Sequence, residues 1–294
     1  MPKETDPARS IDPRDLSLES IYWDQDLTYA GYLSLDTLLG CQHPLTDAHD
    51  EMLFLIIHQA SELWMKLALH ELKAAMREVA GDNLGAAFKM LSRVARIQAQ
   101  LTQSWSVLAT MTPADYLSFR DALGQSSGFQ SFQYREIEYA LGNKNAALME
   151  VHRKRPERHA RLKRTLESPS FYDLCLMLLA RRGFAIPADK LDRDWSEPYE
   201  PSDAVEAAWA EVYSAPQEHW DLYELAEKLV DLEYEFHVWR YSHMKTVQRI
   251  IGFSRGTGGT SGVDFLKKAL DLQFFPELWT VRARLEGRSR GESG

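Results

Sequence analysis

The sequence has little cysteine, no long apolar run and a deficit of positive charge. Its 294 residues include only Cys41 and Cys175, which excludes a disulfide framework and a cysteine-based zinc or iron–sulfur site. Apolar runs such as residues 52–57 are far too short to span a bilayer, and the charged N-terminus lacks the apolar stretch of a secretory signal. The net charge of −9 argues against a nucleic acid or an anionic membrane as partner. These absences predict a cytoplasmic protein.

Helical periodicity is the main pattern that is present. Hydrophobic residues make up 45% of the chain, enough for a sizeable core, and no strand-like alternation or internal repeat occurs. Helices are expected at 50–79, 84–110, 129–141, 168–179, 203–214 and 217–251, while the basic stretch 150–165 is expected to be a solvated surface. The pattern predicts an all-α, bundle-like domain with a long C-terminal helix. We expect a mobile arm at 1–20, a single domain at 21–282 and a flexible tail at 283–294.

Two helix starts have recognisable signals. Thr112, Pro113 and Asp115 stand at the N-cap, first and third positions of a short helix. Asp47 or Asp50 is expected to cap the helix over 50–79. The first turns of that helix are apolar on every side, which predicts that other parts of the protein surround them.

One histidine interrupts the apolar stripe of the longest helix. The residues of this stripe are three or four positions apart, which places them on one face of a helix. They are Leu222, Leu225, Leu229, Leu232, Phe236, Trp239, His243, Val247 and Ile250. His243 therefore faces the core. A core histidine bonded to a backbone carbonyl is the ordinary interpretation, and a metal ligand is the alternative.

A second histidine, His58, ends the apolar segment 52–57 on another helix, and Phe54 shares its face. No His-Glu-x-x-His or Glu-x-x-His motif occurs, which argues against a zincin or a ferritin-like di-iron site. The remaining histidines form no recognisable ligand set. Two buried histidines on separate helices are typical of a haem held between a proximal and a distal side.

Three further segments have a functional and an ordinary interpretation. The loop 256–262 (GTGGTSG) is either a flexible linker or a lid whose amides and hydroxyls hold a small polar group. Arg120 shares a helix face with Tyr116 and binds either a carboxylate ligand or a nearby acidic side chain. The aromatic segment 27–35 packs on the core or supplies aromatic rings to a pocket, including a neighbouring subunit's pocket.

These segments resemble the tryptophan 2,3-dioxygenase family in its bacterial form. The matching motifs are LTYAGYL at 27–33, DEMLFLIIH at 50–58 with SELW at 61–64, LTQSWSVL at 101–108, FRDALGQSSGFQ at 119–130, LGNK at 141–144, WRYSHM at 239–244, and IGFSRGTGG at 251–259 with FFPEL at 274–278. They occur in order over nearly the whole chain, whereas 145–215 and both tails resemble the family less. The resemblance implies a haem-dependent enzyme that adds both atoms of O₂ across the indole C2=C3 bond of L-tryptophan. The product is N-formyl-L-kynurenine, and the reaction is the first step of tryptophan catabolism by the kynurenine pathway.

The resemblance also implies the haem site. One haem b per subunit is expected on His243 as axial ligand, with the distal face open for O₂. His58 is expected to be the distal, catalytic histidine beside the indole N–H, as a positioning partner rather than an obligatory base. Phe54 and Trp105 are expected to line the pocket, and Ser127 to lie next to haem and substrate.

For the substrate, the resemblance implies that Arg120 binds the carboxylate and that Thr257 meets the ammonium group, with Tyr116 in the pocket. It further implies a homotetramer, a dimer of dimers. An N-terminal arm with Tyr29, Tyr32 and Leu33 is expected to reach a neighbouring active site. Two alternatives stay open: a relative that oxidises a different indole, and a haem-binding sensor that has no turnover.

Overall fold

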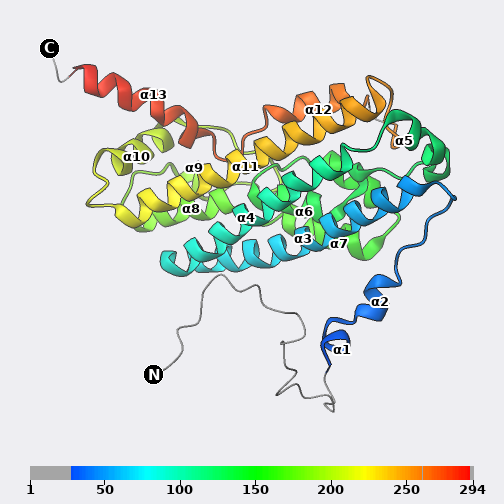
Figure 1. Ribbon diagram of the computed structural model, residues 1–294. Helices are drawn as coiled ribbons and strands as arrows, with labels where there is room; N and C mark the ends of the chain where they lie inside the picture. Colours follow the sequence, from blue (N-terminus) through cyan, green and yellow to red (C-terminus); the bar gives the residue numbers. More distant parts are fainter. Residues whose placement is uncertain (1–27, 260, 292–294) are drawn as a thin grey trace, which may run out of the picture. The chain divides into compact units, whose positions relative to one another are not determined.

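Residues 28–259 and 261–291 are described by the computed structural model, with side chains up to residue 285. The chain divides into two compact units, residues 1–43 and residues 44–294. All regular secondary structure in the described residues is helical, which confirms the all-α prediction (Figure 1). The predicted mobile arm, residues 1–20, lies outside the described residues.

The first unit contains two short helices, α1 (Tyr29–Leu33) and α2 (Leu35–Leu39). The side chain of Thr28 caps α1 by accepting a hydrogen bond from the amide of Gly31 at 3.1 Å. Neither helix has a buried residue. These helices therefore have no hydrophobic core of their own in the described part of the unit.

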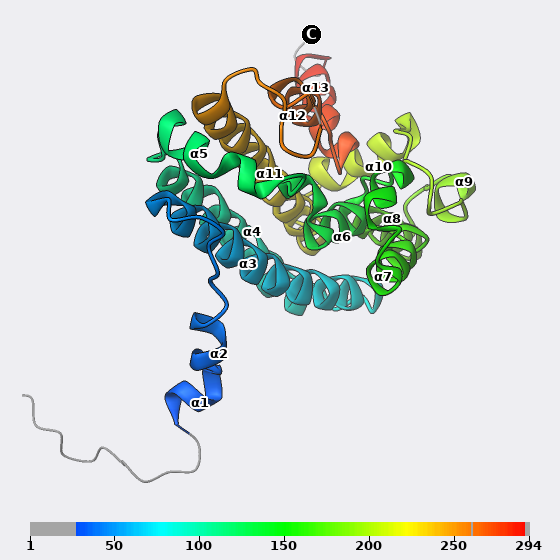
Figure 2. The same ribbon diagram turned by 90° about the vertical axis from the view of Figure 1, so that its right-hand side faces the viewer.

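The second unit contains three long helices that lie side by side. Its helices are α3 (His49–Ala80), α4 (Leu84–Leu108), α5 (Pro113–Phe119), α6 (Phe132–Leu141), α7 (Pro156–Leu166), α8 (Phe171–Arg181), α9 (Ala188–Leu191), α10 (Asp203–Ser214), α11 (Trp220–Ile251), α12 (Val263–Leu270) and α13 (Pro276–Gly291), with 3₁₀ turns η2 (Arg120–Leu123), η3 (Gly128–Gln130) and η4 (Ala146–His152). Helix α4 lies between α3 and α11, and α12 runs along the C-terminal half of α11 (Figures 1 and 2). The predicted bundle architecture matches this arrangement.

The core between the long helices is made by their apolar stripes. Leu72 of α3, Leu91 of α4 and Leu229 of α11 are 0–1% exposed and belong to one cluster. Full burial of each such side chain stabilises the fold by roughly 1.5–3 kcal/mol. This rigid core holds in place the other end of α3 and of α11, where His58 and His243 lie.

The caps explain where two shorter helices begin. Thr112 at the N-cap and Asp115 at the third helical position form a reciprocal capping box, with Pro113 as the first residue of the helix. This confirms the start predicted for α5. Helix α8 begins later than predicted, because Ser170 forms a capping box with Asp173. Ser168 and Pro169 therefore precede the helix instead of opening it.

The start of α3 differs from its prediction. Its N-cap residue is Ala48, without a side-chain cap, so neither Asp47 nor Asp50 caps the helix. Instead the carboxylate of Glu51 accepts hydrogen bonds from the amides of Leu45 and Thr46, at 2.7 and 2.8 Å. A residue inside the first turn thus holds the preceding loop against the helix.

Helix α3 also exposes apolar side chains that were expected to be covered. Met52, Ile56, Leu63, Trp64 and Leu67 are 36–50% exposed, and we call this set the α3 stripe. Within one chain, the prediction that protein surrounds the first turns of α3 is therefore wrong. An apolar stripe of this size is typical of a protein–protein interface.

Several helices were not predicted, among them the short helices α1, α2 and α9. Helix α7 occupies most of the basic stretch expected to be a solvated surface, and α12 and α13 follow the glycine-rich loop. Helix α13 continues to Gly291, into the segment expected to be a flexible tail. Among the described residues, α3 is long and apolar enough to cross a bilayer. Core helices of globular domains meet the same criterion of length and composition.

Candidate active site

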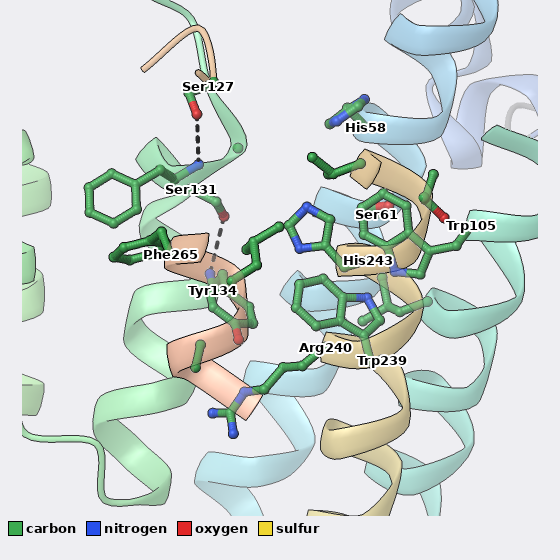
Figure 3. Close-up of a pocket in the computed structure, with 18 of the residues that line it drawn as sticks. His58, Ser61, Trp105, Ser127, Ser131, Tyr134, Trp239, Arg240, His243 and Phe265 are labelled. Carbon is green, nitrogen blue, oxygen red and sulfur yellow. Dashed lines mark hydrogen bonds between the residues drawn. The ribbon is translucent and has the colours of Figure 1, made fainter. Parts of the chain in front are cut away.

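A largely apolar cavity of about 290 Å³ lies in the second unit, between α3, α4, α5, α6, α11 and the loop that follows α11. Eight of its lining residues matter for the chemistry: Phe54, His58, Trp105, Tyr116, Ser127, Trp239, His243 and Thr257. Figure 3 shows His243, Trp105 and Trp239 grouped together, with His58 above them and Ser127 farther along the wall. Seven of these eight residues were predicted to belong to a site; Trp239 was not.

The imidazole of His243 on α11 is held by aromatic rings. It stacks on Trp105 at a centroid distance of 4.6 Å with an interplanar angle of 9°, and Trp239 lies 5.3 Å away. Among the described residues none forms a hydrogen bond with this ring, so the ordinary interpretation, a core histidine bonded to a carbonyl, does not apply. Burial lowers the pKa of His243 to about 4, with a smaller effect from His58. A neutral imidazole with a free nitrogen is the state that binds a metal.

The imidazole of His58 on α3 has a defined tautomer. Its Nδ1 lies 2.7 Å from the carbonyl oxygen of Phe54, one helical turn earlier. Because a carbonyl can only accept, Nδ1 carries the proton and Nε2 keeps a lone pair. Burial lowers the pKa of His58, although the Phe54 carbonyl and Glu62 oppose this. His58 is therefore a neutral hydrogen-bond acceptor in an apolar wall.

Several donors around the cavity are buried without a partner. The indole nitrogens of Trp105 and Trp239 and the Nε of Arg240 have no hydrogen bond within the described structure. Orphaned buried donors are costly unless a bound group satisfies them. The cavity is therefore built for a ligand that has acceptor atoms.

Two histidines line the cavity, and His243 is the one whose ring forms no hydrogen bond with a described residue. No group of three or more His, Cys, Asp or Glu side chains in the described residues could hold a bare metal ion. One histidine ligand beside an apolar cavity suits an iron whose other ligands come from a porphyrin. The orphaned donors suit the carboxylates that a haem carries. The residues present therefore fit haem.

Arg120 does not line this cavity. It follows the last residue of α5 and lies in a neighbouring small pocket, where its Nη2 donates to the carbonyl oxygen of Arg255 at 2.7 Å. Tyr116 lines the cavity, and burial raises the pKa of its hydroxyl, while the nearby charge of Arg120 opposes this shift. The predicted pair is thus adjacent, but of the two only Tyr116 lines the cavity.

Thr257 and Ser127 reach the cavity from two different loops. The Oγ1 of Thr257 donates to the carbonyl oxygen of Ser126 at 2.5 Å. The hydroxyl of Ser127, the N-cap residue of η3, accepts a hydrogen bond from the amide of Phe129. The glycine-rich loop is therefore attached to the segment that contains Ser127, which the linker interpretation would not require.

Tyr29, Tyr32 and Leu33 belong to the first unit. Their side chains are 77%, 73% and 39% exposed. No described residue of the first unit covers them.

Sequence reasoning missed Trp239 as a site residue. Its signal was its place four residues before His243 on the same stripe, which puts both side chains on one helix face. Arg240 was missed as well, because an arginine next to an apolar stripe is normally solvated, whereas here it is 3% exposed.

Comparison with known proteins identifies the family of this chain. A family model described as tryptophan 2,3-dioxygenase matches residues 21–285. A tryptophan 2,3-dioxygenase of Cupriavidus necator is 58% identical over 261 residues, which cover 89% of each chain. That of a Polaromonas species is 55% identical over 96% of this chain and 95% of its own, and that of Bacillus thuringiensis is 57% identical over 89% and 94%. The chain belongs to the tryptophan 2,3-dioxygenase family.

Proposed function

We propose that the cavity between His58 and His243 is where the chain carries out its family's reaction. The chain is an oxidoreductase, a haem-dependent dioxygenase that oxidises L-tryptophan with O₂ to N-formyl-L-kynurenine, the first step of the kynurenine pathway. The observation that supports this location best is the convergence of two neutral histidines from α3 and α11 on one apolar cavity.

His243 is proposed as the axial ligand of one haem b per subunit. Its free, neutral imidazole and its stacking on Trp105 support this role. The orphaned indole nitrogens of Trp105 and Trp239 and the orphaned Nε of Arg240 would meet polar atoms of the haem. When bound, the haem supplies the activation of O₂.

His58 is proposed as the catalytic residue beside the substrate. Because its Nδ1 proton is engaged by the Phe54 carbonyl, its Nε2 is free to accept the indole N–H. This contact would orient the indole without requiring a charged base. Phe54, whose ring centroid lies 4.1 Å from that of His58, would contribute an apolar wall that excludes water.

Arg120, Thr257, Tyr116 and Ser127 are proposed to bind the amino-acid end of tryptophan. Arg120 would pair with the carboxylate and Thr257 would accept from the ammonium group, with Tyr116 and Ser127 completing the wall. The guanidinium of Arg120 lies next to the Tyr116 hydroxyl, and Thr257 already lines the cavity. Fixing both charged ends would place the indole for reaction and account for a large part of the rate enhancement.

The complete site is proposed to include a second subunit. The exposed aromatic side chains of α1 and the exposed α3 stripe both need a covering surface. A homotetramer built as a dimer of dimers would cover them, with Tyr29, Tyr32 and Leu33 reaching a neighbouring site. A cytoplasmic location is proposed because the chain contains only two cysteines, Cys41 and Cys175, too few for a disulfide framework.

An aerobic assay of the haem-loaded ferrous protein tests this proposal. With L-tryptophan, we expect a new absorption band of N-formylkynurenine, and mass spectrometry should find two atoms of ¹⁸O when ¹⁸O₂ is supplied. Turnover of another indole but not of tryptophan would contradict the substrate assignment. Haem binding without any product would indicate a sensor instead.

A further inference from the structure

The glycine-rich loop after α11 is attached to the segment after α5 by two hydrogen bonds. We call residues 252–259 the docked loop. Arg120 donates to the carbonyl oxygen of Arg255, and Thr257 donates to the carbonyl oxygen of Ser126. Both residues proposed to bind the charged end of the substrate therefore also hold the loop. The position of the loop and the geometry of the substrate site are coupled.

A third contact in the same place is possible only for glycine. A Cβ atom on Gly258 would lie 2.7 Å from the Cβ and 2.9 Å from the Oγ of Ser127. Carbon atoms in contact stay about 3.5–4.0 Å apart, so an alanine at position 258 would force the loop back by roughly 1 Å.

The backbone of Gly258 does not itself demand glycine. Gly252, Gly259 and Gly262 have positive φ angles, of 62°, 82° and 61°, where a side chain is strained whatever the space around it. Gly258 is not among the residues with positive φ. The need for glycine at position 258 thus comes from the approach to Ser127.

We propose that Gly258 is a positioning residue for the substrate. Its missing side chain lets the docked loop seat on Ser127, and this seat fixes the hydroxyl of the adjacent Thr257 at the cavity. Gly258 itself does not line the cavity, so it acts through its neighbour. The inference rests on the proposed substrate role of Thr257, because a displaced loop matters for affinity only if that hydroxyl binds tryptophan.

A double-mutant cycle separates this contact from other effects of a larger side chain. Gly258→Ala is combined with Ser127→Gly, which removes both clashing atoms, and with Ser127→Ala, which removes the hydroxyl but keeps the Cβ. Gly85→Ala, on α4 with no atom within 4 Å of the added Cβ, is the matched control for a glycine-to-alanine change. Haem content and helical circular dichroism confirm that each variant is folded.

We expect Gly258→Ala to raise the KM for tryptophan between about tenfold and a hundredfold, since a displacement of about 1 Å is enough for such losses. Gly258→Ala should raise KM by the same factor in the Ser127→Ala background, and by less than about twofold in the Ser127→Gly background. An equal rise in KM in the wild-type, Ser127→Ala and Ser127→Gly backgrounds, or no rise in any of them, would overturn the proposal.

Amide hydrogen exchange of residues 252–259 in the haem-loaded, tryptophan-free protein gives a second measurement that does not depend on the substrate. Gly258→Ala should speed exchange there, and Ser127→Gly should restore protection. Unchanged exchange would overturn the contact itself. Faster exchange with an unchanged KM would overturn the proposal through its premise, the substrate role of Thr257.

Discussion

The side chain of His58 is oriented by its own helix. The 2.7 Å contact from Nδ1 to the Phe54 carbonyl fixes the tautomer, and burial lowers the pKa and keeps the ring neutral, so Nε2 is available as an acceptor. His58→Ala removes this acceptor but leaves His243 untouched. We therefore expect normal haem content and a fall of about tenfold in kcat/KM, the value of one neutral hydrogen bond. Loss of haem from this variant would contradict the distal assignment.

Arg120 offers a second test at the residue scale. Arg120→Leu removes the proposed partner of the substrate carboxylate and one of the two hydrogen bonds to the docked loop. A hydrogen bond to a charged group contributes about 1.5–3 kcal/mol, so KM should rise between about tenfold and a hundredfold. Arg249→Leu is the matched control, because Arg249 lines the same small pocket and donates to the Ala109 carbonyl instead. Equal KM values for the two variants would reject the role of Arg120.

The sequence predicted which residues converge on the site better than how each one points. Tyr116 and Arg120 are four apart and were expected to share one face of a helix. The two side chains do lie next to each other, because Arg120 keeps helical backbone angles and its amide bonds to the Tyr116 carbonyl. The guanidinium, however, also donates to the carbonyl of Arg255, in a loop far away in the sequence, and periodicity does not show such a contact. The approach of Gly258 to Ser127 is a tertiary contact between distant segments, which a single sequence does not contain.

At the scale of elements, the start of α3 depends on one buried carboxylate. Glu51 is 3% exposed and accepts hydrogen bonds from two loop amides and from the Thr46 hydroxyl, at 2.6–2.8 Å. These bonds lower its pKa below the ordinary 4.5, although burial alone would raise it. A lowered pKa means that the charged form stabilises the folded state. This stabilisation is present above about pH 4.5 and is lost as the pH falls through the folded-state pKa.

Glu51→Gln should therefore lower the free energy of unfolding by about 1–3 kcal/mol at neutral pH. The difference from the wild type should shrink as the pH falls through the lowered pKa of Glu51, because both proteins then have a neutral side chain at this position. Urea unfolding at several pH values measures it. Asp50→Asn, in the same helical turn but without a hydrogen bond to its carboxylate in the described structure, is the control. A difference that does not depend on pH would contradict this assignment.

Long helices were predicted more accurately than short ones. The expected helices at 50–79 and 217–251 correspond to α3 and α11 within a few residues, because long apolar stripes have an unambiguous period. Helix α7 was missed because its sequence is dominated by Arg, Lys and His. It buries only Leu162 and Leu166, which gives too weak a stripe to stand out.

At the scale of the whole molecule, the α3 stripe is the strongest sign that the chain assembles with further subunits. Leu63 and Ile56 are 50% and 46% exposed on a helix that also contains His58. Burying such side chains in a subunit interface is favourable by roughly 25 cal/mol per Å² of apolar surface. The proposed tetramer would gain this energy.

Leu63→Glu tests that interface. A charge placed in an apolar contact should dissociate the proposed tetramer into smaller species, which light scattering after size exclusion detects as a reduced mass. Val151→Glu, on η4 and 44% exposed, is a control that introduces the same charge away from the stripe. An unchanged mass for Leu63→Glu, or an equal loss for both variants, would show that the stripe is not the interface.

The central claim is that His243 is the axial ligand of the haem. His243→Gly removes the imidazole and leaves the stacking partners Trp105 and Trp239 in place. The most direct measurement is the absorption spectrum of this variant during haem titration, without and with added imidazole. We predict that the wild type binds one haem per chain with an intense Soret band, that the variant loses this band, and that imidazole restores it. A variant that binds haem stoichiometrically with the wild-type spectrum in the absence of imidazole would contradict the assignment.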